Sequence, residues 1–247
     1  MENTAKVALI TGSSRGIGKA CALRLAEKGF DIAVNYNSNE EAAKKTVEEI
    51  TALGRRAAAY KADTSDLKQV QDMFRAAFKE LGSIDVLVNN AGVVNDAYLL
   101  MLSADSLQKS LDINIKGYFN CAQQAALKMM KNRSGRIINI SSVSSVLSLA
   151  GQSVYSATKG AVNSMTATLA KELAPYGIQV NAVAPGFVET EMITAVPEEK
   201  LKEYLEAIPM KRFAKAEEIA EAVALLADNS LSYMTGQVLI LDGGMSL

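Results

Sequence analysis

Short apolar runs alternate with longer amphipathic stretches along almost all of the 247 residues. Seven runs have the length of strands, and several are apolar throughout, as expected when helices cover both faces of a sheet. The predicted strands are Lys6–Thr11, Asp31–Asn35, Arg56–Lys61, Ile84–Asn89, Arg136–Ile140, Gln179–Ala184 and Val238–Leu241. Strand, helix and strand in succession indicate crossover units and a parallel sheet.

Between these runs, apolar side chains recur at helical spacing, with charged side chains on the other face. The predicted helices are Glu40–Leu53, Leu67–Leu81, Ser106–Lys131, Ser153–Ala174 and Ala216–Ala227. No linker, low-complexity tract or repeat divides the chain. We therefore expect a single α/β domain over 1–247, a Rossmann-type doubly wound parallel sheet of about seven strands with helices on both faces.

The segment 187–213 breaks this rhythm. It contains Pro197, Pro209 and a short amphipathic stretch, Glu198–Ala207. An insertion after the sixth strand is placed to cover a site at the carboxyl edge of the sheet. The alternative is a surface loop with no role in the site.

The chain contains no histidine, and this excludes whole classes of site. A Ser-His-Asp triad and a His-Glu-x-x-His zinc site are both impossible. The two cysteines, Cys21 and Cys121, are too few for a disulfide framework, and no metal site is expected. Acid–base chemistry must therefore fall to Tyr, Lys, Asp, Glu or Cys.

Charge and hydropathy patterns limit the partners. Lys and Arg total 26 and Asp and Glu total 27, so no overall basic field for nucleic acid exists. No run approaches the ~18 apolar residues of a membrane-spanning helix. The first strand-like run begins so early that no room is left for a signal peptide, and a cytoplasmic protein is expected.

A glycine-rich turn follows the first predicted strand and opens the first helix. Gly12 can make the tight turn, Gly16 lets the backbone approach phosphates, and Gly18 lets helix pack on strand. A pyrophosphate would meet the unpaired N–H groups of a helix N-terminus at this point. The remaining residues of the turn that we expect at a cofactor are Ser14, Arg15 and Ile17.

Two details favour NADP over NAD as the cofactor. No Asp or Glu stands at the end of the second strand, where ribose hydroxyl groups would be bound. Arg15 can instead meet a 2′-phosphate, with Asn37 and Ser38 as neutral donors.

Tyr155 and Lys159 lie four residues apart within a predicted helix, so both side chains share one face. A phenol beside an ammonium can give and take a proton without histidine. A nearby positive charge favours the phenolate, so we expect Lys159 to lower the pKa of Tyr155 from its usual value near ~10.

Taken together, these motifs resemble those of the short-chain dehydrogenases/reductases over essentially the whole chain. The matching residues are Thr11-Gly-x-x-x-Gly-x-Gly18, Asn89-Asn-Ala-Gly92, Asn114, Ser142, Tyr155-x-x-x-Lys159 and Pro185-Gly186. The resemblance implies that Tyr155 is the acid–base residue and that Ser142 bonds the substrate oxygen. It also implies that Lys159 holds the nicotinamide ribose and that Asn114 anchors a water in a proton relay.

The same resemblance implies further cofactor contacts. It places Asp63 and Thr64 at the adenine, although Asp63 could instead cap the following helix. The other implied cofactor residues are Asn90, Ala91, Gly92, Tyr155, Lys159, Pro185, Gly186, Val188 and Thr190.

Within the family, the chain is most similar to members that use NADPH to reduce 3-oxoacyl groups on acyl carrier protein. Such members have basic residues for an acidic carrier, and Arg133 matches one position whereas Tyr176 replaces a second. Lys128, Lys131 and Arg136 could compensate. Members of this type are usually homotetramers. Reductases of acyl-CoA, sugars, steroids or polyketides share most of the motifs and stay open as alternatives, as does a protein that binds cofactor without turnover.

Overall fold

The computed structural model describes residues 5–190 and 198–247. Seven strands form one sheet, in the order β3-β2-β1-β4-β5-β6-β9, and every pairing is parallel. The strands are β1 (Val7–Ile10), β2 (Asp31–Tyr36), β3 (Ala57–Lys61), β4 (Val86–Asn89), β5 (Gly135–Ile140), β6 (Ile178–Pro185) and β9 (Val238–Leu241). The expected single α/β domain with a seven-stranded parallel sheet is confirmed.

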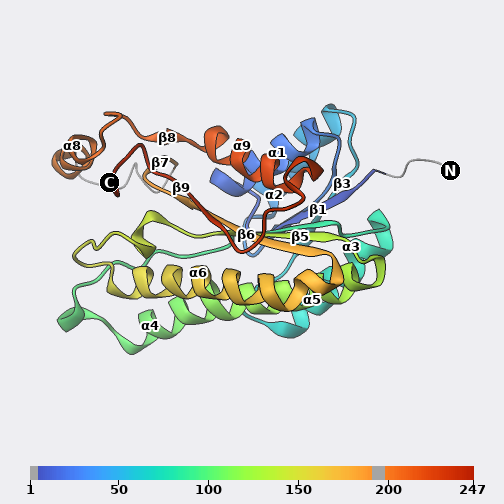
Figure 1. The fold of residues 1–247 in the computed structure, drawn as a ribbon, viewed down its shortest axis with the longest axis horizontal. Coiled ribbons are helices and arrows are strands. Elements are labelled where there is room, and N and C mark those ends of the chain that lie inside the picture. Colours follow the sequence, from blue (N-terminus) through green and yellow to red (C-terminus); the bar gives the residue numbers. More distant parts are fainter. Residues whose placement is uncertain (1–4, 191–197) are drawn as a thin grey trace.

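Helices cover both faces of the sheet (Figure 1). One apolar cluster lies under α1 (Gly16–Glu27), α2 (Glu40–Ala52) and α9 (Ala216–Ala227). A second lies under α3 (Leu67–Leu81), α5 (Gly117–Asn132) and α6 (Ser153–Leu173). Because neighbouring residues of a strand point to opposite faces, adjacent side chains of one strand belong to different clusters.

The predicted helix Ser106–Lys131 is helical throughout, but it is not a regular α-helix. The structure has α4 (Ala104–Leu111), a π-helical stretch over Asp112–Lys116, and then α5. Apolar spacing continues through the widened turn, so periodicity did not reveal it. π-helical turns often occur at functional sites, and this one carries Asn114 inward, where its side chain is fully buried.

The two ends of the segment after β6 are tied to each other. Strand β7 (Val188–Glu189) pairs with β8 (Ala214–Lys215), and α8 (Glu198–Ala207) lies between them in sequence. The Phe187 ring stacks on Tyr204 at 4.3 Å between centroids and meets Phe213 edge-on at 6.0 Å. Residues 191–197 of the predicted insertion, with Pro197, lie outside the described residues.

Short 3₁₀ helices complete the connections, at Leu99–Met101, Val143–Ser145, Ala174–Tyr176 and Asn229–Leu231. The strand order reverses between β1 and β4, since β2 and β3 extend to one side and β5, β6 and β9 to the other. In open α/β sheets, ligands bind in the crevice beyond the carboxyl ends of the strands at such a point. We therefore expect the ligand site at the turns after β1 and β4.

Candidate active site

The turn after β1 has the shape of a phosphate cradle. Gly12 and Gly16 have φ angles of +62° and +55°, which side chains rarely adopt. A Cβ on Gly18 would lie 2.4 Å from the Gly12 carbonyl oxygen, so α1 can begin this close to the turn only with glycine there. The N-terminus of α1 faces the crevice with its first N–H groups, an arrangement that fits a pyrophosphate.

The turns after β1 and β4 are locked together. The Thr11 hydroxyl oxygen accepts from the backbone N–H groups of Asn90 (2.8 Å) and Ala91 (3.0 Å). The Asn90 amide donates to the carbonyls of Thr11 (2.9 Å) and Gly12 (3.1 Å). Asn90 and Ala91, which we expected at the cofactor, thus also form one rigid floor with the glycine turn.

Asn35 is a site residue that the sequence reasoning missed. Its Oδ1 accepts from the Gly12 N–H at 3.0 Å, and its Nδ2 donates to the carbonyls of Tyr60 and Ala62. It is buried at the end of β2 and holds the glycine turn to β3. An amide among otherwise apolar strand residues was the available signal.

The residues expected at the adenine end lie around the same crevice. Arg15, Asn37 and Ser38 are exposed, the last two directly after β2. Asp63 does not cap α3, because Asp66 accepts from the Gln69 N–H in that role. The Asp63 carboxylate instead accepts from the N–H and hydroxyl of Ser65.

Other expected cofactor residues close the crevice from the far side. Thr190 lies opposite the glycine turn, since a Cβ on Gly16 would meet its methyl group at 3.8 Å. The Gly186 N–H donates to the Leu241 carbonyl and so ties the end of β6 to β9. The remaining predicted residues here are Ser14 and Ile17 in the glycine turn, Thr64 against α5, and Pro185 and Val188 at the end of β6 and in β7.

Lys159 is almost completely buried at 3% exposure. Its ammonium donates to the Ile140 carbonyl at 2.7 Å and to the Tyr118 hydroxyl oxygen at 3.3 Å. A Cβ on Gly92 would lie 3.9 Å from this nitrogen, so the glycine lets the loop after β4 approach the lysine. Burial disfavours the charged form and lowers the pKa of Lys159 to about 7.

Tyr155 lies one helical turn before Lys159, and its ring centroid is 5.6 Å from the ammonium. Burial raises the pKa of Tyr155 to about 12, while a hydrogen bond with Ser142 lowers it and the Asp96 charge raises it. The expectation that Lys159 lowers this pKa is wrong for this structure. The ammonium lies against the ring and bonds the strand below, so desolvation dominates.

Ser142 heads a chain of hydrogen bonds that ends on a carboxylate. The Asp96 carboxylate can only accept, so Gln152 turns its Nε2 toward it at 3.0 Å and its Oε1 toward Ser144. The Ser144 hydroxyl donates to that oxygen at 2.9 Å and lies 3.2 Å from the Ser142 hydroxyl. Sequence reasoning missed these three supporting residues, because their loops meet only in the fold.

Asn114 clamps the loop after β4 to the catalytic helix. Its Oδ1 accepts from the Val93 N–H at 2.8 Å, and its Nδ2 donates to the Val93 carbonyl and the Thr158 hydroxyl. All of these side-chain bonds go to protein groups. The side chain therefore positions the loop and helix around Lys159, and the expected water relay stays a prediction.

The structure does not bring Arg133 to this site. Arg133 ends α5 just before β5 begins, whereas Ser142 follows the other end of that strand. Its guanidinium donates to the Pro175 carbonyl at 2.6 Å. Arg136 cannot compensate as suggested, because it is buried and donates to the Asp228 carbonyl and the Asn229 side chain.

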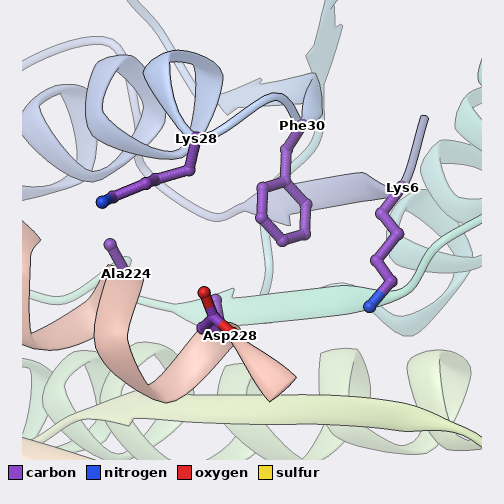
Figure 2. Close-up of a pocket in the computed structure, with 6 residues that line it drawn as sticks. Lys6, Lys28, Phe30, Ala224 and Asp228 are labelled. Atoms are coloured by element: carbon purple, nitrogen blue, oxygen red, sulfur yellow. The ribbon is translucent and has the colours of Figure 1, made fainter. Parts of the chain in front are cut away.

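A separate hollow of about 210 Å³ lies at the opposite edge of the sheet. Figure 2 shows Lys6, Lys28, Phe30, Ala224 and Asp228 around it, between the start of β1 and the ends of α1 and α9. Residues 5–190 and 198–247 contain no group of three potential metal ligands. The same residues include no helix long and apolar enough to cross a membrane.

These features define a dinucleotide-binding oxidoreductase site: a phosphate cradle at the switch point, with a phenol, a lysine and a serine beside it. Residues 12–246 match the family model described as enoyl-(acyl carrier protein) reductase. The chain belongs to the short-chain dehydrogenase/reductase family.

Curated relatives and a solved structure agree with this family. The 3-oxoacyl-[acyl-carrier-protein] reductase FabG of Staphylococcus aureus is 45% identical over 240 residues, covering 97% of this chain and 98% of that protein. The 3-oxoacyl-[acyl-carrier-protein] reductase of Synechocystis is 44% identical over 243 residues, covering 98% and 97%. A gluconate 5-dehydrogenase from Burkholderia cenocepacia, in complex with NADP and tartrate, has a TM-score of 0.93 and 36% identity, covering 98% and 95%.

Proposed function

We propose that this protein uses NADPH to reduce a 3-oxoacyl thioester on acyl carrier protein to the 3-hydroxyacyl thioester. The observation that carries the proposal is the placing of Tyr155 one helical turn from the buried Lys159 and beside Ser142, next to the glycine cradle. Relatives at 44–45% identity over nearly the whole chain carry the name of this activity.

Tyr155 serves as the proton donor. Its raised pKa keeps the phenol protonated at neutral pH, ready to donate to the substrate carbonyl oxygen. When substrate binds, the Ser142 hydroxyl turns its single proton from Ser144 to the same oxygen and stabilises the charge that develops on it. Lys159 supplies positive charge below the phenol, and Asn114 holds the loop and helix around it. Bound NADPH supplies the hydride to the carbonyl carbon.

The crevice fits a dinucleotide phosphate. Gly12, Gly16 and Gly18 leave the cradle open, and the N-terminus of α1 provides N–H donors for the pyrophosphate. Arg15 with Asn37 and Ser38 binds the 2′-phosphate of NADPH, since no carboxylate stands directly at the end of β2 to bind ribose hydroxyl groups. Michaelis constants for NADPH and NADH test this preference, and equal use of NADH would contradict it.

The segment 187–213 covers the acyl group. Its two ends are paired through β7 and β8, and Phe187, Tyr204 and Phe213 form an aromatic cluster within it. We expect the covering segment to exclude water from the reaction.

Arg133 remains our proposed docking residue for the carrier protein. It lies at the far end of β5 from Ser142, so such docking serves the site of another subunit in the homotetramer that we also propose. Arg133→Glu is expected to raise the KM for carrier-bound substrate and leave the KM for a free thioester unchanged. An unchanged KM for both would remove the docking role. A cytoplasmic location accords with such a substrate and is part of the proposal.

A second candidate, a dehydrogenase of a free hydroxy compound, is favoured by the likeness to the gluconate 5-dehydrogenase. A panel of 3-oxoacyl thioesters, keto sugars and steroids, followed by NADPH oxidation, separates the two. We expect the highest kcat/KM with a 3-oxoacyl thioester on carrier protein. Higher kcat/KM for a keto sugar or steroid would overturn the proposal.

A further inference from the structure

Tyr118 is a buried residue beneath the site that no motif predicted. It lies in the first turn of α5, directly after the π-helical stretch, and is 2% exposed. Its hydroxyl donates to the Ile140 carbonyl at 2.8 Å and lies 3.3 Å from the Lys159 ammonium, which itself reaches the same carbonyl at 2.7 Å. Three polar groups thus form a closed triangle below the reacting groups.

The directions of these hydrogen bonds are forced by chemistry. A carbonyl oxygen can only accept and an ammonium can only donate. The Tyr118 hydroxyl must therefore give its proton to Ile140 and offer a lone pair to Lys159. Two of the three ammonium N–H groups point at this floor, and one remains for groups on the crevice side, where Gly92 approaches.

We propose that Tyr118 is a positioning residue for Lys159, in that its hydroxyl supplies the second acceptor that keeps the lysine charged and directed toward the crevice. The proposal rests on the role of Lys159 in the proposed function. It concerns a residue that would touch neither substrate nor cofactor and would act only through the lysine.

A single hydrogen-bond acceptor matters for Lys159 because few polar groups surround its ammonium. The groups that face Lys159 are Tyr155 from its own helix, Tyr118 with Cys121 behind it from α5, and the neutral carbonyl of Ile140 from β5. Burial raises the pKa of Tyr118 and of Cys121, so both are neutral near pH 7. Asp96, from the loop after β4, acts on Tyr155. In the part of the chain that the structure describes, no carboxylate pairs with the ammonium.

The direction in which removal of the Tyr118 hydroxyl changes the pKa of Lys159 can therefore be predicted. Loss of an acceptor destabilises the charged form and lowers the pKa of Lys159 further. Burial already lowers the pKa of Lys159 to about 7, so the lysine titrates near neutral pH. A further fall of about one unit would shift this titration below pH 7.

The test compares Tyr118→Phe, which removes one oxygen, with the wild type and a matched control. Tyr60→Phe is that control, since Tyr60 is a mostly buried tyrosine on β3 whose hydroxyl bonds Glu80, remote from Lys159. Lysine labelled with ¹³C at Cε gives the titration midpoint of Lys159, assigned by its loss in Lys159→Arg. NADPH affinity from pH 6 to 9 is measured by fluorescence.

We expect the midpoint of Lys159, and with it the pH at which NADPH affinity declines, to fall by about one unit in Tyr118→Phe only. Should this variant not fold, Tyr118→Met removes the same acceptor. An unchanged midpoint in a folded variant would overturn the proposal. Neither measurement uses an acyl substrate, so a wrong substrate assignment would leave both readouts intact.

Discussion

The two faces of the sheet are built from the same strands but carry different chemistry. Under α1, α2 and α9 the buried side chains form a continuous apolar cluster. Under α5 and α6 the apolar cluster gives way, toward the carboxyl ends of the strands, to fully buried polar residues. These are Asn89, Asn114, Asn139, Thr158 and Thr166.

The difference shows how one face becomes reactive while the other supports it. The Asn89 amide nitrogen donates to Asn139, whose own amide donates to Thr166, so these side chains are linked inside the core, whereas the Asn89 Oδ1 has no hydrogen-bond partner. Most buried polar groups in proteins are paired, and a linked network of them fixes one arrangement of the side chains. Four predictions test this division, from the largest expected effect to the smallest.

The largest effect is expected from Tyr155→Phe on the polar face. Removal of the proposed proton donor should lower kcat by about 10²–10⁴. NADPH affinity, measured by fluorescence, should stay within about twofold, because the ring and Lys159 remain. Wild-type turnover in this variant would refute the mechanism.

Adjacent residues of β5 test the two faces against each other. Ile138 packs under α1 and α9, whereas Asn139 bonds Thr166 of α6. Ile138→Ala should lower the free energy of unfolding by about 2–4 kcal/mol through cavity formation, with kcat nearly unchanged. Asn139→Ala leaves buried partners unpaired and should lose about 1–3 kcal/mol together with activity. Urea unfolding and kcat are measured for both, and equal loss of kcat in both would remove the distinction.

We expect Lys159 to lower the free energy of unfolding, because its charged form is buried away from water. Its pKa is about 7 in the folded protein, below its value when unfolded, so between pH 7 and about 10 the unfolded chain binds more protons. Stability from this group therefore rises with pH across that window. Lys159→Met should be inactive yet more stable by about 1–2 kcal/mol at pH 6, with a smaller gain at pH 9. A constant difference in urea unfolding would contradict the burial argument.

The smallest effect is expected from Ser144→Ala. This change cuts the hydrogen-bond chain from Asp96 and Gln152 to Ser142, so the Ser142 hydroxyl loses one fixed partner. A loss of about threefold to tenfold in kcat is expected, the worth of one hydrogen bond. Ser83→Ala is the control, since Ser83 bonds Asp85 at the other edge of the sheet. Equal kcat in both variants would show that the chain does not orient Ser142.

The sequence predicted most of the fold because its signals are local. Apolar runs located all seven strands, and glycines at fixed spacing located the cradle, since a turn that needs positive φ selects glycine. It missed the π-helical turn at Asn114, because side-chain periodicity hardly changes across five residues. It also misjudged Arg136, whose burial depends on a loop about ninety residues later in the chain.

By itself, then, the sequence determined the sheet, the glycine cradle and the phenol–lysine pair on one helix face. The tertiary structure alone decided what surrounds that pair: Tyr118 from α5, the Ile140 carbonyl from β5, and the chain from Asp96 to Ser142. The physical reason is that pKa values depend on desolvation and on neighbours brought in from distant segments. Spacing can place a tyrosine beside a lysine, but only packing sets which of them is charged.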